Sequence, residues 1–157
     1  MGRVKNILFV CHGNICRSPM AEFIMKDMLA KAGLEGQIHI ESAAVSSEEI
    51  GNPVYGPARR ELEKHGITCQ GKVARKMSAQ DYDKFDIILA MDNSNLYNLK
   101  RICGDPRGKV KLILEYAGRP NSEVSDPWYT GDFAKAYSDI SEACEGLLKS
   151  LQAGKKL

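Results

Sequence analysis

Short apolar runs alternate along this chain with longer segments in which apolar residues recur at three- and four-residue spacing. The short runs predict buried strands at Lys5–Val10, Gln37–Ser42, Asp86–Met91 and Lys109–Leu112. The longer segments predict helices from Ser18 to before Gly33, at Ala58–His65, at about Ser94–Ile102 and at Phe133–Leu151. Because alternating strands and helices need crossover connections, we expect a parallel sheet with helices on both faces. The predicted fold class is α/β, with a four-stranded parallel sheet in a Rossmann-like three-layer sandwich.

The length and the charge balance argue against a membrane protein and a nucleic-acid-binding protein. At 157 residues the chain is expected to form a single domain over residues 1–157, and no apolar run approaches the ~18 residues of a membrane-spanning helix. Its 22 basic and 20 acidic residues leave a formal net charge of only +2. That balance gives no general attraction to nucleic acid, so any anion must be bound by a local site.

The cysteines predict a reducing environment. They are five in number and widely scattered: Cys11, Cys16, Cys69, Cys103 and Cys144. The apolar stretch Ile7–Val10 has four residues, fewer than the roughly 7–15 apolar residues of a secretory signal. We therefore expect a cytoplasmic protein whose cysteines are mostly small buried apolar residues, with export without a signal peptide left open.

One turn concentrates residues that carry chemistry. Between the first predicted strand and the first predicted helix the sequence reads Cys11-His12-Gly13-Asn14-Ile15-Cys16-Arg17-Ser18-Pro19. Backbone N–H groups and the helix dipole converge at such a turn, which suits a tetrahedral dianion. Cys69 and Arg75 have the same spacing as Cys11 and Arg17, but they do not lie between a strand and the start of a helix.

Each position in this turn has a predicted role. Cys11, beside Arg17 at a helix start, is expected to ionise to a thiolate and act as the nucleophile. Gly13 and Asn14 tolerate the positive φ values that wrap backbone amides around an oxyanion. Arg17 can bind two phosphoryl oxygens at once, and Ser18 can donate a hydrogen bond to the thiolate. The alternative is that Cys11 packs in the core and Arg17 pairs with a surface carboxylate.

Transfer of a phosphoryl group to a thiolate also needs a general acid for the leaving oxygen. Two Asp-Pro pairs lie in predicted loops, Asp105-Pro106 and Asp126-Pro127. We predict Asp126 as the acid because Trp128 and Tyr129 follow it, and aromatic side chains suit an aromatic leaving group. The alternative for Trp128 is an ordinary loop-packing residue.

These motifs resemble the low-molecular-weight protein tyrosine phosphatases. The resemblance is carried by four segments: the turn from Cys11, Lys64-His65-Gly66-Ile67, Met91-Asp92-Asn93-Ser94-Asn95-Leu96 and Asp126-Pro127-Trp128-Tyr129. It implies a four-stranded parallel sheet with helices on both sides, and a two-step reaction that uses neither metal nor cofactor.

The resemblance also implies roles for single residues. By matching position, Cys11 is the nucleophile, Arg17 clamps the phosphoryl group, and Asp126 is first the acid and then the base. The hydrogen-bond network that holds the turn in this family is expected to consist of Asn14, Ser18, Ser42 and His65.

The chain departs from the family after its second strand. The family usually has Ser-Ala-Gly-Thr there and then a tryptophan that lines the cleft, whereas this chain has Ser42–Gly51 with Glu48 near the tryptophan's place. Tyr55-Gly56-Pro57 stands where Asp-Pro-Arg is usual. We expect His12 and Ile15 at the pocket floor, with Glu48 favouring basic residues beside a phosphotyrosine. The predicted substrate-binding residues are His12, Gly13, Asn14, Ile15, Cys16, Ser18, Glu48, Trp128 and Tyr129.

Three other functions share parts of this pattern. An arsenate reductase needs two further redox cysteines close together, and Cys69 and Cys103 are far apart in the sequence. A protein-arginine phosphatase carries threonine at the position of Ile15. A catalytically silent phosphate-binding module needs neither the Cys11 thiol nor the Asp126 carboxyl, and both are present.

The expected partners follow from the phosphatase prediction. A phosphotyrosine protein is the expected substrate, with a tyrosine kinase or its targets as partner, and the chain is expected to be a monomer or a weak dimer. No metal site is predicted, because His12, His39 and His65 lie on separate elements and the cysteines lack zinc-like spacing. No nucleic-acid or membrane partner is predicted.

Overall fold

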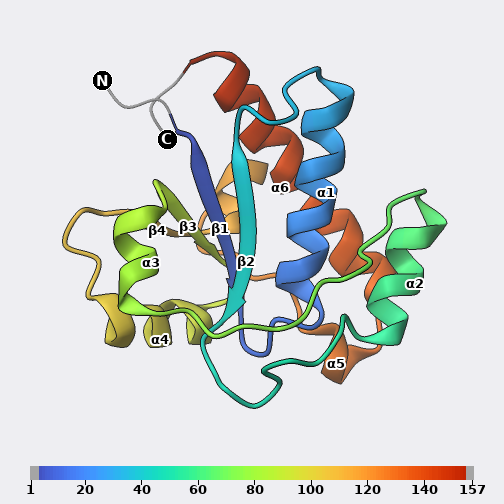
Figure 1. The fold of residues 1–157 in the computed structure, drawn as a ribbon, viewed down its shortest axis with the longest axis horizontal. Helices are drawn as coiled ribbons and strands as arrows, with labels where there is room; N and C mark the ends of the chain where they lie inside the picture. Colours follow the sequence, from blue (N-terminus) through green and yellow to red (C-terminus); the bar gives the residue numbers. More distant parts are fainter. Residues whose placement is uncertain (1–3, 155–157) are drawn as a thin grey trace.

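The computed structural model describes residues 4–154, and Figure 1 shows the arrangement of their helices and strands. The strands are β1 (Asn6–Cys11), β2 (His39–Ala44), β3 (Ile87–Ala90) and β4 (Val110–Leu112). The α-helices are α1 (Arg17–Lys31), α2 (Gly56–Lys64), α3 (Ala79–Lys84), α4 (Asn93–Cys103), α5 (Pro127–Thr130) and α6 (Phe133–Gln152). A short 3₁₀ helix, η1 (Ile113–Ala117), follows β4 directly.

The four strands form one parallel sheet in the order β2-β1-β3-β4. β1 therefore lies between β2 and β3, so that its carboxyl end has a neighbouring strand on each side. Cys11, the last residue of β1, pairs with Ala44, and Val10 pairs with Ala90. The carboxyl ends of the three strands thus meet at one sheet edge, which is where parallel α/β folds bind ligands.

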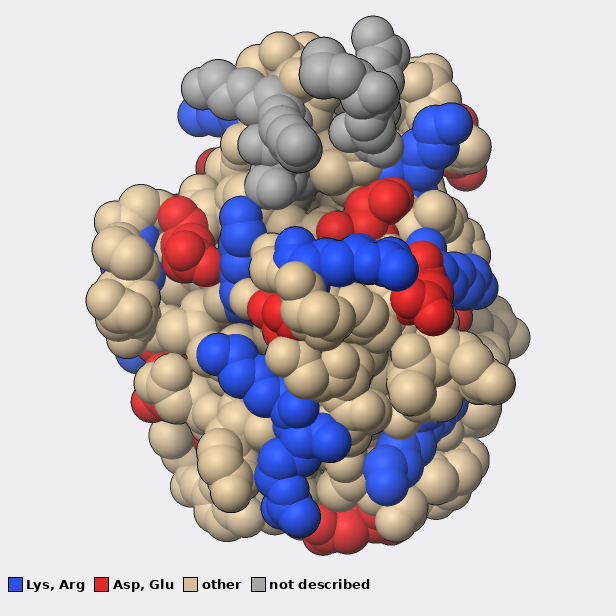
Figure 2. Space-filling view, turned by 90° about the vertical axis from the view of Figure 1, so that its left-hand side faces the viewer, with Lys and Arg blue, Asp and Glu red and all other residues tan. Residues whose placement is uncertain are grey.

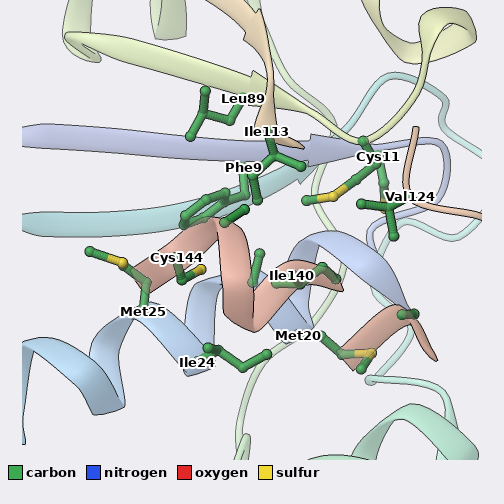
Figure 3. Close-up of a cluster of buried hydrophobic side chains, with 14 of the residues drawn as sticks. Phe9, Cys11, Met20, Ile24, Met25, Leu89, Ile113, Val124, Ile140 and Cys144 are labelled. Atoms are coloured by element: carbon green, nitrogen blue, oxygen red, sulfur yellow. The ribbon is translucent and has the colours of Figure 1, made fainter. Parts of the chain in front are cut away.

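Two hydrophobic clusters fill the space on opposite faces of the sheet. Ile7 and Phe9 of β1 belong to the first cluster, which packs against α1 and α6 (Figure 3). Leu8 and Val10 belong to the second, together with residues of α3, α4 and β4. Successive side chains of a strand point to opposite faces, so both faces of β1 are buried and its sequence is apolar from Ile7 to Cys11. This arrangement is the three-layer sandwich that the sequence predicts.

The predicted fold class is confirmed, and the differences lie in short elements. The four strands and the four longer α-helices fall within a few residues of their predicted positions. The helices α3, η1 and α5 are not among the predicted elements, and each has six residues or fewer. None of the described helices is both long and apolar enough to cross a bilayer.

Candidate active site

The turn from Cys11 to Ser18 joins the end of β1 to the first residues of α1. Asn14 adopts the left-handed backbone conformation, with φ of 60°, as predicted. Gly13 does not have a positive φ, so that expectation is wrong. Gly13 is constrained differently: a Cβ at this residue would lie 3.3 Å from Cγ of Glu49, which belongs to the loop after β2. Glycine therefore lets the two loops approach each other.

Three hydrogen-bond partners surround the buried sulfur of Cys11. Its Sγ lies 2.9 Å from Ser18 Oγ, 3.3 Å from the backbone nitrogen of Asn14 and 3.4 Å from that of Ser18. Donors directed at a sulfur atom stabilise its thiolate, which is the nucleophilic form of cysteine. The turn thus provides the surroundings that a nucleophilic thiolate needs.

The side-chain amide of Asn14 connects the turn to β2. Its Nδ2 donates to Ser18 Oγ at 2.8 Å and to Ser42 Oγ at 3.0 Å. Its Oδ1 accepts a hydrogen bond from the backbone N–H of Arg75 at 3.1 Å, which fixes the orientation of the amide. The structure therefore brings together Asn14, Ser18 and Ser42, three of the four residues in the expected network.

His65 is not part of this network, and the expectation for it is wrong. It is exposed at the end of α2, where its Nε2 lies 3.3 Å from Glu61 Oε2 and its ring stacks on Tyr137 with centroids 3.8 Å apart. Lys72, which lies further along the chain, is a basic residue that does contact β2. The Nζ of Lys72 donates to the carbonyl oxygen of Ser42 at 2.9 Å.

Arg17 is held at the bottom of the site by acceptors from two other segments. Its side chain is 2% exposed, and one guanidinium nitrogen donates to Asp92 Oδ2 and to the carbonyl of Val124, each at 2.8 Å. The other donates to Asp126 Oδ2 at 3.3 Å. Burial acts to lower the pKa of Arg17, but the neighbouring Cys11, Asp92 and Asp126 outweigh it and raise that pKa above its usual value. The guanidinium is therefore a fixed cation close to the Cys11 sulfur.

Asp92 is a site residue to which the sequence analysis gave no role. It caps the N-terminus of α4 by accepting from the backbone N–H of Asn95 at 2.8 Å, while its second oxygen contacts Arg17. One feature of the sequence could have predicted this role: the polar residues Asp92 and Asn95 come directly after a buried strand. That pattern is typical of a helix cap at the ligand-binding edge of the sheet.

Of the two Asp-Pro pairs, only the second lies at the site. Asp126 caps α5, with Oδ1 accepting from the backbone N–H of Trp128 at 3.0 Å and Oδ2 facing Arg17. Asp105 lies in the turn before β4, where its carboxylate accepts from Tyr82 Oη at 2.9 Å and from the backbone N–H of Lys109 at 2.7 Å. The structure therefore gives Asp105 a place in the fold away from the pocket.

The pocket above Cys11 has a volume of about 130 Å³ and opens to solvent between two loops. Its lining residues are Cys11, His12, Gly13, Ile15, Cys16, Arg17, Glu48, Glu49, Asp126, Trp128 and Tyr129. Asn14 and Ser18, predicted to bind substrate, lie buried beneath the turn and not on this lining. Glu49 lines the pocket although it was not predicted. Burial raises the pKa of Cys16 to about 12, so this second thiol stays protonated beside Cys11.

His12 lies at the rim and not at the floor as predicted. Its side chain is half exposed, and its Nε2 lies 2.6 Å from Oε2 of Glu48. The two loops are also joined through Ser46, whose backbone N–H and Oγ both donate to the carbonyl of His12, at 3.2 and 2.9 Å. Together His12 and Glu48 form one wall of the pocket mouth.

Aromatic residues also line the pocket. Trp128 and Tyr129 of α5 are 52% and 84% exposed. Tyr55, which the sequence analysis noted only as a departure, packs against Trp128 with ring centroids 4.8 Å apart. Its backbone N–H donates to the carbonyl of Ile15 at 2.9 Å, so Tyr55 connects these aromatic residues to the turn.

Within residues 4–154, no group of three or more His, Cys, Asp and Glu side chains could hold a metal ion. The arrangement itself can bind a tetrahedral dianion between the turn amides and Arg17, with a sulfur below it and a carboxyl group beside it.

Comparison with known proteins agrees with this geometry. A family model described as low molecular weight phosphotyrosine protein phosphatase matches residues 6–157. The Bacillus subtilis protein low molecular weight protein-tyrosine-phosphatase YfkJ is 44% identical over 154 residues, which cover 97% of this chain and 99% of that protein. A low molecular weight phosphotyrosine protein phosphatase of Gallus gallus is 39% identical over 153 residues, covering 94% and 96% of the two chains.

Solved structures give the same result. The crystal structure of YfkJ superposes with a TM-score of 0.92 over 99% of both chains, at 43% identity. A structure described as a Drosophila arginine phosphatase superposes with a TM-score of 0.83 over 91% of this chain and 95% of that one, at 36% identity. Near-complete coverage by both sequence and structure means that this chain belongs to the low molecular weight phosphotyrosine protein phosphatase family.

Proposed function

We propose that this chain hydrolyses phosphotyrosine in proteins, and small aryl phosphates, through a phosphocysteine formed on Cys11. The observation that carries the proposal is the convergence of three groups on one pocket. The Cys11 sulfur receives hydrogen bonds from the turn, Arg17 is fixed next to it, and the Asp126 carboxyl faces Arg17 from the opposite loop. The family model's match to residues 6–157 supports treating the whole chain as one catalytic domain.

In the first step the Cys11 thiolate attacks phosphorus and the bond to the phenolic oxygen breaks. The turn amides and Arg17 hold the three equatorial oxygens, whose charge they stabilise better than water would. Asp126 gives its proton to the departing phenolate, so tyrosine leaves as a neutral phenol. The product is a phosphocysteine, with Asp126 now ionised.

In the second step water replaces the thiolate. The ionised Asp126 takes a proton from the water as it attacks phosphorus, and the sulfur–phosphorus bond breaks. Inorganic phosphate leaves, Asp126 is protonated again, and Cys11 returns as a thiolate held by Ser18 and the turn amides. No metal ion is needed at either step.

The test is turnover of an aryl phosphate by the pure protein in the presence of a chelator. We expect Cys11→Ser to abolish turnover, and Arg17→Lys nearly to do so because lysine cannot contact two phosphoryl oxygens at once. Cys69→Ser is the matched control, since Cys69 is buried away from the pocket and has an arginine at the same spacing. Retention of more than a few per cent of activity by Cys11→Ser would show that the mechanism is wrong.

The pocket walls support an aromatic phosphate as substrate. Trp128 and Tyr129 provide flat apolar surface for a phenyl ring, a contact worth on the order of 1 kcal/mol beyond area burial. The sulfur of Cys11 is buried below the rim. A phosphotyrosine is long enough to place its phosphate there, whereas a phosphoserine is not, so we expect a wide preference for phosphotyrosine.

The other wall supports a preference for basic flanking residues. Glu48 and Glu49 bring two carboxylates to the pocket lining, and His12 is the residue that faces Glu48. A lysine or arginine beside the phosphotyrosine would find an opposite charge there, and an acidic residue would be repelled. Because Glu48 is already paired with His12, we expect the preference to be modest.

The alternatives have less support. One solved relative is described as an arginine phosphatase. This chain has Ile15 where a protein-arginine phosphatase is expected to carry threonine, and turnover of phosphoarginine by this protein would favour that activity all the same. For an arsenate reductase, Cys69 and Cys103 would have to approach Cys11 in turn. Cys69 lies in the cluster beneath α1 and α6, whereas Cys103 packs against the cluster on the other face of the sheet.

We also propose a cytoplasmic location, a monomer or weak dimer, and a tyrosine kinase or its targets as partner. All five cysteines are free thiols, which fits a reducing compartment. The tyrosine kinase or its targets as partner follows from a phosphotyrosine substrate.

A further inference from the structure

Tyr55 occupies the N-cap position of α2 but does not cap the helix. Its φ of −58° and ψ of 136° are those of a residue just before a helix, yet its side chain makes no capping hydrogen bond. Short polar residues are preferred at this position, because their side chains accept hydrogen bonds from the first backbone N–H groups of the helix. Tyrosine forgoes that stabilisation, and its ring makes contacts of another kind.

The ring of Tyr55 packs against two aromatic residues that follow Asp126 in the chain. Its centroid lies 4.8 Å from that of Trp128 and 6.0 Å from that of Phe133, the first residue of α6. Both separations fall within the range of attractive aromatic pairs. Tyr55 is 37% exposed and is not among the residues that line the pocket. Its effect on the pocket is therefore exerted through Trp128.

The helix that carries Trp128 has few buried contacts of its own. α5 has four residues, Pro127–Thr130, and Pro127 is the only one of them that is buried. A helix of this length is not stable by itself and depends on packing against the rest of the molecule. Trp128 is half exposed and packs its ring against Tyr55. The contact with Tyr55 is thus one of the few that hold α5 in place.

Trp128 in turn orients the Asp126 carboxyl group. Its backbone N–H donates to Asp126 Oδ1 at 3.0 Å, which leaves Oδ2 facing Arg17 at 3.3 Å. A general acid must lie within hydrogen-bond reach of the oxygen that it protonates. A displacement of the Trp128 backbone would move the carboxyl group with it, and a misplacement of about 1 Å can cost up to 10²-fold in rate.

The backbone of Tyr55 is fixed to the turn that carries the nucleophile. Its N–H donates to the carbonyl of Ile15 at 2.9 Å, and its own carbonyl accepts from the N–H of Arg59 in α2, also at 2.9 Å. One residue therefore joins the turn and the start of α2 to α5.

Resting on the proposed function, we propose that Tyr55 is a positioning residue for the general acid. Its ring holds Trp128, and the backbone of Trp128 sets the place of the Asp126 carboxyl group relative to a phosphate bound above Cys11. Tyrosine at this N-cap loses a helix cap and in exchange fixes the distance between the acid and the nucleophile.

The test is the dependence of kcat/KM on the leaving group over a series of aryl phosphates, because this ratio reports the step in which the phenol departs. We expect Tyr55→Ala to lose roughly 5- to 30-fold with the least acidic phenols. With the most acidic phenols, which leave without a proton, the loss should be less than about twofold. Tyr55→Phe keeps the ring and should match the native chain. Tyr97→Ala is the matched control, since Tyr97 is an exposed tyrosine of α4 that does not line the pocket.

Tyr55→Asp separates positioning of the acid from support of the fold. Aspartate supplies the missing cap of α2, so this variant should resist urea better than Tyr55→Ala. It lacks the ring, so it should show the same selective loss with the less acidic phenols. If Tyr55→Asp instead regained the activity that Tyr55→Ala loses, the effect would follow stability and the proposal would be overturned.

The contact between the two rings can be measured without turnover, because Trp128 is the only tryptophan of the chain. We expect acrylamide to quench its fluorescence more strongly in Tyr55→Ala and Tyr55→Asp than in the native chain, since the ring that covers the indole is gone. Tyr55→Phe and Tyr97→Ala should leave the quenching unchanged. Native quenching in Tyr55→Ala would show that Tyr55 does not hold Trp128, and would overturn the proposal.

A double variant shows whether Tyr55 acts through the acid. Tyr55→Ala/Asp126→Asn should be no slower than Asp126→Asn alone. Losses that multiply, or a loss of equal size for every phenol, would mean that Tyr55 acts on substrate binding, and would overturn the proposal. A native protein that hydrolyses no aryl phosphate would refute the proposed function, whereas an active native protein with a fully active Tyr55→Ala variant would refute this inference alone.

Discussion

Asp126 uses its two carboxylate oxygens for two purposes. One oxygen caps α5 through the backbone N–H of Trp128, and the other faces Arg17. Asparagine caps a helix about as well as aspartate does, so Asp126→Asn should leave α5 in place. What the variant removes is the proton that the leaving group needs.

We therefore expect Asp126→Asn to reduce kcat by about 10²–10⁴, the usual contribution of a general acid. The loss should be larger for aryl phosphates whose phenols are less acidic, because these depend most on protonation. Asp105→Asn is the control, since Asp105 is bound to Tyr82 and Lys109 in the turn before β4. Steady-state kinetics over a series of phenols checks this, and equal losses in the two variants would contradict the assignment.

A second prediction at the residue scale concerns His12 and Glu48. An exposed ion pair contributes only ~0–1 kcal/mol, so basic flanks should be preferred by no more than about fivefold in kcat/KM. Glu48→Gln should erase that preference, whereas His12→Asn should increase it because Glu48 loses its partner. Phosphotyrosine peptides that differ only in flanking Lys, Ala or Glu provide the measurement. A preference for acidic flanks, or no change in either variant, would exclude Glu48 from substrate recognition.

At the scale of elements, the sequence predicts strands and long helices because their signals are local. β1 and β3 are buried on both faces and therefore read as unbroken apolar runs. Short helices contain too few residues to show apolar side chains repeating at three- and four-residue spacing. α3 is instead marked by a capping box, Ser78 with Asp81, and α5 by Asp126 followed by proline. Those caps could have predicted both helices, because they depend on residue type and not on repetition.

The place of Lys72 could not be predicted in this way. It is set by contacts between segments far apart in the chain: Lys76 forms a bridge with Ala44 of β2, and Val73 forms another with Pro53. These contacts draw the segment after α2 against β2, whereas His65 stays on α2. The resemblance assigned His65 to the network, but the structure leaves it beside Glu61 and Tyr137.

The contact between α6 and η1 gives a prediction about packing. Gly146 lies inside α6, where glycine is unfavourable by about 1 kcal/mol relative to alanine. A Cβ at Gly146 would lie 1.8 Å from the carbonyl oxygen of Tyr116, a backbone atom that cannot move aside as a side chain would. The close approach of two elements explains the glycine.

We expect Gly146→Ala to lower the free energy of unfolding by roughly 1–3 kcal/mol, despite its better helix propensity, because one backbone must shift. Urea denaturation measures this. Glu145→Ala, at the exposed neighbouring position, should change stability little. If the Gly146→Ala protein were more stable than the native chain, α6 and the carbonyl of Tyr116 could not be as close as this contact requires.

At the scale of the whole molecule, charges of both signs are spread over the surface. On the face shown in Figure 2, basic and acidic side chains lie close to one another. Glu41 of β2 illustrates the pattern, since it accepts hydrogen bonds from Arg75 and Lys84, both at 2.9 Å, and from His39. Such a surface gives no long-range attraction to a polyanion, so substrate charge is recognised at the pocket itself.

Glu41 also makes folding stability depend on pH. Burial acts to raise its pKa, but His39, Lys84 and Arg75 outweigh that effect and lower the pKa from 4.5 to about 2. A carboxylate with a lowered pKa in the folded state stabilises the fold above its unfolded pKa, and this contribution disappears as the pH falls through the folded value. Glu41 is partly solvated, so its contribution is about 1 kcal/mol and not the full value implied by the shift.

We therefore expect Glu41→Gln to be about 1 kcal/mol less stable than the native chain at pH 7, because the glutamine keeps the shape but loses the charge. The difference should shrink as the pH falls from about 4.5 towards 2, where the native glutamate takes up its proton. Urea denaturation of both proteins at a series of pH values measures it, with Glu35→Gln, an exposed carboxylate, as the control that should show a small difference throughout. A difference as large at pH 2 as at pH 7 would mean that the glutamate acts through packing and not through its charge.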